Sequence, residues 1–349
     1  MPFSTIDRSS DYFRIKLYTG NGTSQSITFD ETKSMQPEFV WIKKRNAIDD
    51  NVVFDAVRGA TKRIQTNQTN AETTYSGALT SFDSNGFSLG DAGYLNESAK
   101  TYVAWSFDAN GTGVSNTAGT ISSTVSANTT SGFSIVSYTG NGTGGATIGH
   151  GLGAVPKMII IKGRATTYNW VVGHNSLSTN WGKYLTLSTT DAVETATNVF
   201  NDTAPTSSLF SIGTALGVNT SSSTYIAYCF AEVKGFSKAF SYTGNGSTDG
   251  SYVHLGFRPA FVMIKRTDSA SQWVMFDVAR NTYNLTNLEL YPNGSDAEVA
   301  GARSIDILSN GFKARTTSAD TNASGGTYVG ISFASNPFVS SKGVPVCAR

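Results

Sequence analysis

The heptapeptide PEFVWIK, at Pro37–Lys43, returns twice in altered form, as PKMIIIK at Pro156–Lys162 and as PAFVMIK at Pro259–Lys265. Each copy is a short, continuous apolar run that begins with proline and ends with lysine. Proline suits the first residue of a strand and would break a helix, so each copy predicts a buried β-strand. We expect the closing lysine of each strand to reach solvent.

Two further motifs recur beside this strand, in the same order in each copy. The first is the turn sequence YTGNG, whose two glycines and asparagine tolerate positive φ angles, and it begins at Tyr18, Tyr138 and Tyr242. The second alternates β-branched and aromatic residues, and it reads TYVAWSF at Thr101–Phe107, TYIAYCF at Thr224–Phe230 and TYVGISF at Thr327–Phe333. Three motifs in one order, found three times, indicate three tandem copies of one unit.

The predicted fold is all-β, with three tandem antiparallel β-sandwich domains of jelly-roll-like form, because each copy holds several short strands separated by Gly, Asn and Ser turns. We place them at residues 11–108, 119–232 and 235–338, and call them repeats one, two and three. The polar stretch between repeats one and two predicts a linker. The middle copy departs most from the others, since it reads WVVGHN at Trp170–Asn175 where they carry Phe-Asp followed by Arg.

The charge composition argues against several classes of partner. The 349 residues include 26 Lys and Arg and 25 Asp and Glu, so the net charge of +1 leaves no basic footprint and we expect no nucleic-acid partner. No stretch approaches the roughly 18 apolar residues of a membrane span, so we expect no membrane insertion. The N-terminal residues lack the basic and apolar regions of a secretory signal. The nearest approach to a basic patch is Lys43, Lys44, Arg45, Arg58, Lys62 and Arg63.

A carboxylate and a guanidinium recur three residues apart, as Asp55 with Arg58 and as Asp277 with Arg280. The pattern could mark a reactive site, but its recurrence in two copies favours an ion pair that fixes a turn. An exposed pair of this kind contributes only about 0–1 kcal/mol to stability.

Three glutamates, Glu72, Glu194 and Glu298, also invite an acid–base interpretation. Glycoside hydrolysis needs two carboxyl groups at a set separation, and no second carboxylate recurs beside these glutamates. We expect them to cap structure or face solvent.

No residue shows the spacing of a metal site or a catalytic nucleophile, so we predict no catalytic, cofactor-binding or metal-binding residues, no cofactor and no enzymatic activity. Serines replace Cys229 in the other two copies, which argues against a nucleophilic thiol. The histidines share no ligand spacing, and structural roles are expected for His150 and His174. The remaining residues of these types are His254 and Cys347.

Six aromatic residues fall outside the repeated motifs: Tyr75, Tyr94, Tyr168, Trp181, Tyr283 and Tyr291. Exposed aromatic rings stack on sugars or anchor protein interfaces, and buried ones fill cores. The sequence leaves both roles open for each of the six.

In combination, DYFRIKLYTGNG, PEFVWIKKRN, FDAVRG, SNGFSLG, SGFSIVSYTGNG and FRPAFVMIKRTDS resemble a repeat family of tailed bacteriophages, common in marine and cyanobacterial phages. The likeness runs from about Asp11 to Phe338. The family is described as virion or tail-fibre structural proteins. The resemblance therefore implies a virion protein made in the host cytoplasm, with no catalytic residues to carry over.

Within that class, the leading hypothesis is a tail fibre or receptor-binding component that recognises a host surface glycan or outer-membrane receptor. The alternative is a head-decorating or tail-adaptor protein. An enzyme such as a capsule depolymerase would need clustered carboxylates, which the sequence does not show.

The expected partners are other virion proteins and further copies of the chain. Cyclic assembly lets one gene fill several equivalent positions on a symmetric particle, so we expect a homo-oligomer, as a trimer. Three domains in a rod would gain lateral support from parallel association, and the near-zero net charge does not oppose it. A monomer that attaches one copy at a time is the alternative.

Overall fold

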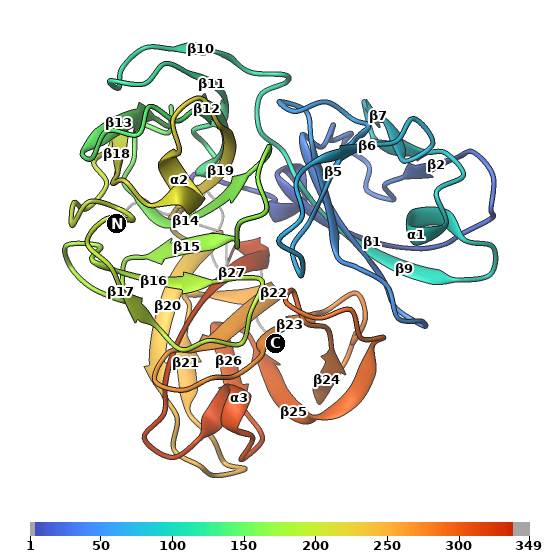
Figure 1. Ribbon diagram of the computed structural model, residues 1–349. Coiled ribbons are helices and arrows are strands. Elements are labelled where there is room, and N and C mark those ends of the chain that lie inside the picture. The colour runs from blue at the N-terminus through green and yellow to red at the C-terminus, as the bar shows by residue number, and fades with distance from the viewer. Residues whose placement is uncertain (1–3, 338–349) are drawn as a thin grey trace.

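A computed structural model describes residues 4–337 and shows an all-β protein of antiparallel sheets (Figure 1), which confirms the predicted fold class. The strands of the described part form six sheets, and each repeat supplies two of them. The helical parts are short: η1 (Ser9–Asp11), α1 (Gly93–Asn96), α2 (Leu216–Asn219) and α3 (Ala319–Asn322).

Repeat one has a six-stranded sheet, in the order β1-β9-β3-β4-β5-β6, and a three-stranded sheet, in the order β2-β8-β7. Its strands are β1 (Phe13–Thr19), β2 (Gln25–Thr28), β3 (Phe39–Lys44), β4 (Val52–Asp55), β5 (Lys62–Gln65), β6 (Thr73–Thr74), β7 (Leu79–Asp83), β8 (Gly86–Leu89) and β9 (Thr101–Phe107).

Repeat two has an eight-stranded sheet, in the order β10-β11-β12-β19-β14-β15-β16-β17, and a two-stranded sheet of β13 and β18. Its strands are β10 (Val114–Asn116), β11 (Ser123–Asn128), β12 (Phe133–Thr139), β13 (Ala146–Gly149), β14 (Pro156–Gly163), β15 (Val171–His174), β16 (Lys183–Thr186), β17 (Glu194–Thr195), β18 (Leu209–Ile212) and β19 (Thr224–Ala231). Strand β10 lies in the predicted linker and pairs with β11, so part of that stretch belongs to the sheet.

Repeat three has two four-stranded sheets, in the orders β20-β27-β22-β23 and β21-β26-β25-β24. Its strands are β20 (Ser237–Thr243), β21 (Tyr252–His254), β22 (Phe257–Arg266), β23 (Trp273–Asp277), β24 (Thr286–Glu289), β25 (Val299–Leu308), β26 (Gly311–Ala314) and β27 (Thr327–Pro337).

The YTGNG turn recurs because a buried asparagine binds it. In repeat one the side-chain oxygen of Asn96 accepts the backbone N–H of Asn21 at 2.9 Å, and the Asn96 carbonyl accepts the N–H of Gly22 at 2.7 Å. A buried amide must find such partners to offset its desolvation. The equivalent side-chain bonds join Asn219 to Asn141 at 2.9 Å and Asn322 to Asn245 at 3.0 Å.

The two tyrosines of the repeated motifs face each other across neighbouring strands. The rings stack with centroids 5.0 Å apart for Tyr18 and Tyr102, 5.2 Å for Tyr138 and Tyr225, and 4.8 Å for Tyr242 and Tyr328. The hydroxyl of the second tyrosine donates to a carbonyl in the adjoining short helix in every repeat. The three copies therefore share one local structure at these motifs.

The apolar runs do not alternate because each strand is buried on both faces. In β3, Val40 and Ile42 pack in a core that belongs to repeat one, whereas Phe39 and Trp41 point to a core that all three repeats share. Strands β14 and β22 divide their side chains in the same way. A strand between two cores needs a continuous hydrophobic sequence.

The shared core lies where the three repeats meet at the centre of Figure 1. The phenylalanines that close the TYV-type motifs, Phe107, Phe230 and Phe333, pack against one another with ring centroids 5.9, 4.8 and 5.9 Å apart. One comes from each repeat, so they mark a pseudo-threefold axis. The expected rod of three domains is wrong. The strand that carries the TYV-type motif has a second apolar face in each repeat, and this face is buried against the other repeats in the shared core.

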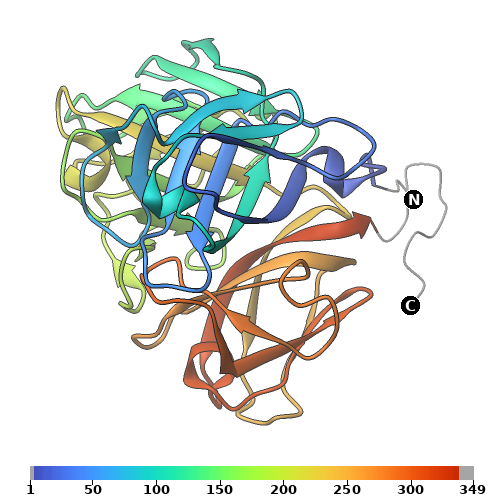
Figure 2. The same ribbon diagram turned by 90° about the vertical axis from the view of Figure 1, so that its right-hand side faces the viewer.

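The ring of repeats closes on itself. Figure 2 shows η1 beside the end of β27, and η1 packs against both β1 and β27. Repeat one therefore contacts repeat three as well as repeat two.

Truncating Phe107 should destabilise the whole molecule rather than one repeat. Its ring packs against Phe13, Phe133, Phe230 and Phe333, so Phe107→Ala should lower the free energy of unfolding by about 3–5 kcal/mol. Urea unfolding followed by tryptophan fluorescence measures this, since four tryptophans lie in the shared core.

The matched control is Tyr283→Ala, which removes an aromatic ring that is 85% exposed and should cost less than about 0.5 kcal/mol. The wild-type transition should be single. Separate transitions for the repeats would contradict a shared core.

Candidate functional site

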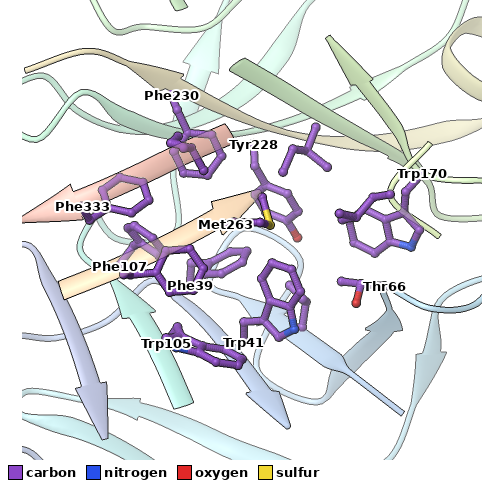
Figure 3. Close-up of a pocket in the computed structure, with 15 residues that line it drawn as sticks. Phe39, Trp41, Thr66, Trp105, Phe107, Trp170, Tyr228, Phe230, Met263 and Phe333 are labelled. Atoms are coloured by element: carbon purple, nitrogen blue, oxygen red, sulfur yellow. The ribbon is translucent and has the colours of Figure 1, made fainter. Parts of the chain in front are cut away.

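A small cavity lies inside the shared core (Figure 3), with a volume of about 30 Å³. Its lining comes from all three repeats and includes Trp41, Trp105, Trp170, Tyr228 and Met263. An apolar cavity offers water no hydrogen-bond partners and stays dry. This space is too small for a cofactor, so we interpret it as imperfect packing on the axis and not as a binding site.

A buried polar network crosses the interface between repeats one and two. Arg58 donates from Nε to Asp55 Oδ2 at 2.5 Å and from its backbone N–H to Asp55 Oδ1 at 2.8 Å, which confirms the ion pair that fixes a turn. Both side chains are fully buried, so the small contribution of an exposed ion pair does not apply to this one. Tyr228 of repeat two donates to Asp55 Oδ2 at 2.6 Å.

Glu72 extends this network and is held by two guanidinium groups. Arg164 of repeat two donates to both of its carboxylate oxygens, at 2.9 and 3.0 Å, and Arg58 donates to Oε2 at 3.2 Å. Burial alone would raise the pKa of Glu72, but these arginines hold it below its usual value. A carboxylate fixed in this way stays ionised and serves as a structural acceptor.

A second network of equivalent residues joins repeats one and three. Arg280 donates to Asp277 Oδ2 at 2.6 Å and to Glu298 Oε2 at 3.1 Å. Arg45 of repeat one pairs with both oxygens of Glu298, at 2.9 and 2.7 Å, and Trp105 donates from Nε1 to Asp277 Oδ2 at 3.1 Å. Trp105 and Tyr228 occupy the same position in their motifs, and each donates a hydrogen bond to the aspartate of a neighbouring repeat.

The third interface, between repeats two and three, has exchanged this network for apolar contacts. Ile331 stands where Trp105 and Tyr228 stand, and His174 ends β15 where aspartate ends β4 and β23. Leu177 replaces the arginine three residues later and packs against the shared core. At this interface uncharged residues replace both the carboxylates of the network and the arginines that bind them, so no charge of the network is left without its partner.

The histidine of this interface is a structural residue, as expected. The N–H of Ser176 donates to His174 Nδ1 at 3.1 Å, so the proton lies on Nε2, which donates to the Gly330 carbonyl of repeat three at 3.1 Å. Burial lowers the pKa of His174 to about 4 and keeps the ring neutral.

Glu194 is not the counterpart of Glu72 and Glu298. The N–H of Val193 donates to the Thr267 carbonyl at 2.8 Å, as Glu72 and Glu298 donate to the carbonyls of Arg164 and Arg45 at 2.7 Å. Val193 and Thr267 therefore replace the glutamate and the arginine together. Glu194 itself is exposed and accepts from the Tyr184 hydroxyl at 2.7 Å.

The lysines that close the heptapeptides do not reach solvent, contrary to expectation. Lys43, Lys162 and Lys265 are fully buried, and each ammonium donates to a carbonyl of another repeat: Lys43 to Ser295 at 3.1 Å, Lys162 to Thr69 at 2.9 Å and Lys265 to Thr190 at 2.9 Å. Burial lowers the pKa of all three to about 8. The sequence concealed this because a strand end normally faces water.

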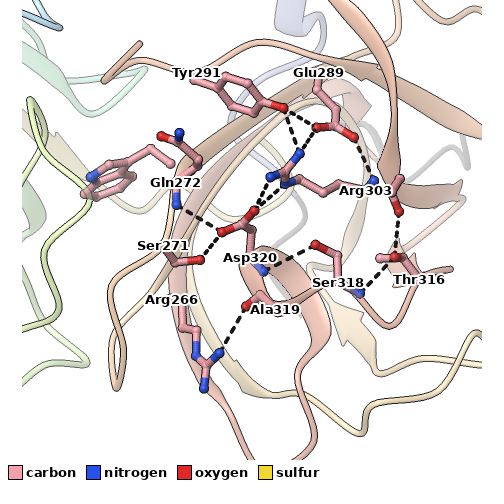
Figure 4. A network of polar contacts seen from close by, with 12 residues as sticks. Arg266, Ser271, Gln272, Glu289, Tyr291, Arg303, Thr316, Ser318, Ala319 and Asp320 are labelled. Carbon is pink, nitrogen blue, oxygen red and sulfur yellow. Dashed lines mark hydrogen bonds and ion pairs between the residues drawn. The ribbon is translucent and has the colours of Figure 1, made fainter.

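Repeat three carries a polar cluster of its own (Figure 4). Arg303 donates to Glu289 Oε2 at 2.7 Å and pairs with Asp320, and its guanidinium lies 5.2 Å from the ring centroid of Tyr291. Asp320 also accepts from Ser271. Each carboxylate is bound to the arginine, so the cluster links β24, β25 and α3 and contains no free acid–base pair.

The other candidate residues are structural or lie apart. Cys229 is buried, and burial raises the pKa of its thiol to about 12, so it stays protonated. His150 is buried, accepts the N–H of Leu152 at 3.2 Å and donates to the Thr206 carbonyl at 3.2 Å. Cys347 and Phe338 lie outside the described residues.

The six unassigned aromatic residues separate by exposure. Trp181 and Tyr291 are buried, Tyr94 and Tyr168 are half-buried, and Tyr75 and Tyr283 are 45% and 85% exposed.

Lys44, Arg45 and Arg58 of the supposed basic patch each bind carboxylates. Between residues 4 and 337 there is no group of three side chains able to hold a metal ion, and no helix long and apolar enough to cross a membrane.

A family model described as "Domain of unknown function (DUF7483)" matches residues 8–337, which include nearly all of the three repeats. A search of curated proteins finds no match to the chain.

The buried lysines should make stability rise in mild alkali. Lysine in an unfolded chain titrates near pH 10.4, so between about pH 8 and 10 the unfolded chain binds more protons than the folded chain and the free energy of unfolding should increase with pH. Urea unfolding at several pH values should show a smaller increase for Lys162→Met. Lys157→Met, on the same strand but partly exposed, is the control and should keep the wild-type slope. Identical slopes in both variants would refute this.

Removing one charge from a charged interface should destabilise the fold more than replacing the whole set of interacting residues by an uncharged set. Asp55→Asn leaves Arg58 and Tyr228 facing a neutral group and should destabilise by about 3–5 kcal/mol. Glu194→Gln should change stability by less than about 0.5 kcal/mol.

The decisive variant transplants the third interface onto the first, as Asp55→His, Arg58→Leu, Glu72→Val, Arg164→Thr and Tyr228→Ile. It should lose less stability than Asp55→Asn in chemical denaturation. A larger loss in the transplant would show that the two kinds of interface are not interchangeable.

Proposed function

The chain belongs to the DUF7483 family, and we propose, from the likeness of its repeated motifs to a repeat family of tailed phages, that it is a structural protein of a tailed-phage virion. We propose further that it is a tail-fibre or receptor-binding component that contacts the host surface. It would be made in the bacterial cytoplasm and act as part of the virion, with other virion proteins as its partners.

The observation that carries the proposal is the separation of recurring from divergent residues. The recurring residues form the turns, the shared core and two of the three inter-repeat interfaces. The aromatic residues that differ between copies include the exposed Tyr75 and Tyr283. A constant interior that carries a varied surface suits a protein that displays binding loops on a rigid scaffold.

We infer that each repeat is a β-sandwich domain, with the boundaries 11–108, 119–232 and 235–338. What supports this is that each pair of sheets encloses a separate buried cluster, around Phe87 in repeat one, Phe210 in repeat two and Phe312 in repeat three.

We propose no enzymatic activity. The carboxylates that recur, at Asp55, Asp277, Glu72 and Glu298, are bound by arginines inside interfaces. Glycoside cleavage requires an acid and a base that can reach substrate. Asp55 and Asp277 are fully buried, and Glu72 and Glu298 are each held by two arginines, so none of the four is free to act as an acid or a base.

A trimer in the virion remains our expectation, but its geometry changes. The apolar stripe that parallel chains were expected to share is used within one chain, where the three repeats meet. Further copies would associate through the outer faces of the repeats.

The second candidate is a head-decorating or tail-adaptor protein. The pseudo-threefold arrangement of Phe107, Phe230 and Phe333 favours it, because such a molecule fits a threefold position on a symmetric particle.

Cryo-electron microscopy of the phage that encodes the chain tests both. We expect density for the three-lobed molecule at the distal end of the tail, and purified protein added to host cells should reduce phage adsorption. Density on the capsid lattice would select the second candidate, and absence of the chain from purified virions would refute both.

A further inference from the structure

An open depression lies on the outer side of repeat one, where β2, β6, β7 and α1 come together in Figure 1. It has a volume of about 570 Å³, within the usual range for small-molecule sites. Its walls are the turn after β1, the segment between β6 and β7, and the segment between β8 and α1.

The depression holds an exposed ring beside a carboxylate. Tyr75 donates its hydroxyl to Asp91 Oδ1 at 2.9 Å, which fixes the ring while 45% of the residue remains exposed. Within the described residues, Asp91 Oδ2 accepts no hydrogen bond. A fixed aromatic ring can stack on a ring of a ligand, and the free acceptor beside it can accept a hydrogen bond from a hydroxyl on that ligand ring.

Two glycines bring these side chains together. A Cβ on Gly77 would lie 2.1 Å from Asp91 Oδ1, and a Cβ on Gly90 would lie 2.5 Å from the Gly77 carbonyl oxygen. Larger residues at either position would push the Tyr75 segment away from Asp91. The pair therefore depends on close backbone approach.

The remaining lining is hydroxylic and neutral. Ser24, Ser76 and Thr80 are exposed, and no hydrogen bond engages their hydroxyl groups in the described structure. Asp91 is the one charged residue among those that line the depression. A carboxylate repels phosphate, sulfate and uronate groups, so the lining suits an uncharged, hydroxyl-rich ligand.

The pair occurs in repeat one and has no counterpart in the other repeats. The N–H of Ala92 donates to Gly77 and that of Ala215 to Asn198, so Tyr75 and Asp91 correspond to Ala196 and Thr214 in repeat two.

In repeat three, equivalence of Glu72 and Glu298 places Gly301 where Tyr75 stands. A Cβ at Gly301 would lie 2.0 Å from Glu289 Oε1, because the polar cluster of Figure 4 fills this edge. The three copies thus share their turn motifs and differ at this place on the surface.

We propose that this depression binds a neutral pyranose of a surface polysaccharide, which stacks on Tyr75 and donates a hydroxyl hydrogen bond to Asp91. That the polysaccharide belongs to the host cell rests on the proposed function, whereas the sugar site itself does not.

Saturation-transfer NMR on the full chain tests the site, with the methyl glycosides of glucose, galactose, mannose and N-acetylglucosamine as probes and methyl glucuronide as the anionic comparison. At least one neutral glycoside should show saturable transfer to its ring protons. Tyr75→Ala should weaken that binding at least tenfold, and Tyr75→Phe, which keeps the ring, should weaken it less. Asp91→Asn should weaken it severalfold.

The matched control is Tyr283→Ala, which removes a more exposed ring in repeat three and should leave binding unchanged. Thermal unfolding of each variant checks that the fold is retained. No binding of any neutral glycoside, tighter binding of the glucuronide, or binding that survives Tyr75→Ala would overturn the proposal. These outcomes leave the location of the chain in the virion, which microscopy decides, unaffected.

Discussion

The contact among Phe107, Phe230 and Phe333 is the constraint on which the rest of the structure depends. It requires three strands from distant parts of the sequence to converge on one line, and it leaves each of those strands with apolar side chains on both faces. A sheet buried on both sides can carry no alternating pattern, so the central strands must be continuously hydrophobic. The domain cores, the interfaces and the buried lysines follow from that convergence.

The charged interfaces contribute more to the pairing of particular surfaces than to net stability. Burying an ion pair costs desolvation energy that roughly offsets its attraction, and apolar replacements are often as stable. The interface that contains His174, Val193 and Ile331 shows this within one molecule, because it closes the same ring without the arginines. The charges make repeat one specific for its two neighbours, since a mismatched pairing would bury an unmatched arginine.

Much of the architecture could be predicted from the sequence. The repeated motifs predicted the strands at Phe39–Lys44 and Thr101–Phe107, and the Asp-Arg spacing predicted the ion pairs at Asp55 and Asp277. These features depend on neighbours within a few residues or on a periodic pattern.

What the sequence did not reveal depends on contacts across repeats. Nothing near Lys43 indicates that the Ser295 carbonyl will accept a hydrogen bond from its ammonium, because the two residues are 252 positions apart. The signal that could have shown the interfaces was the joint change at five positions of the middle and third copies. That joint change is visible only when Val193, and not Glu194, is aligned with Glu72 and Glu298. The pairing of Tyr75 with Asp91 carried no signal, because neither residue belongs to a recurring motif.

The three interfaces differ in their chemistry, so the three repeats are not equivalent although their arrangement is pseudo-threefold. Repeat one is flanked by carboxylate–arginine contacts on both sides, whereas repeats two and three meet through apolar side chains and a buried histidine that is neutral near pH 7. Both contacts of repeat one with its neighbours therefore depend on matched opposite charges, and the contact between repeats two and three does not. The repeat that bears Tyr75 is thus the one whose position in the ring is set by charge matching on both sides.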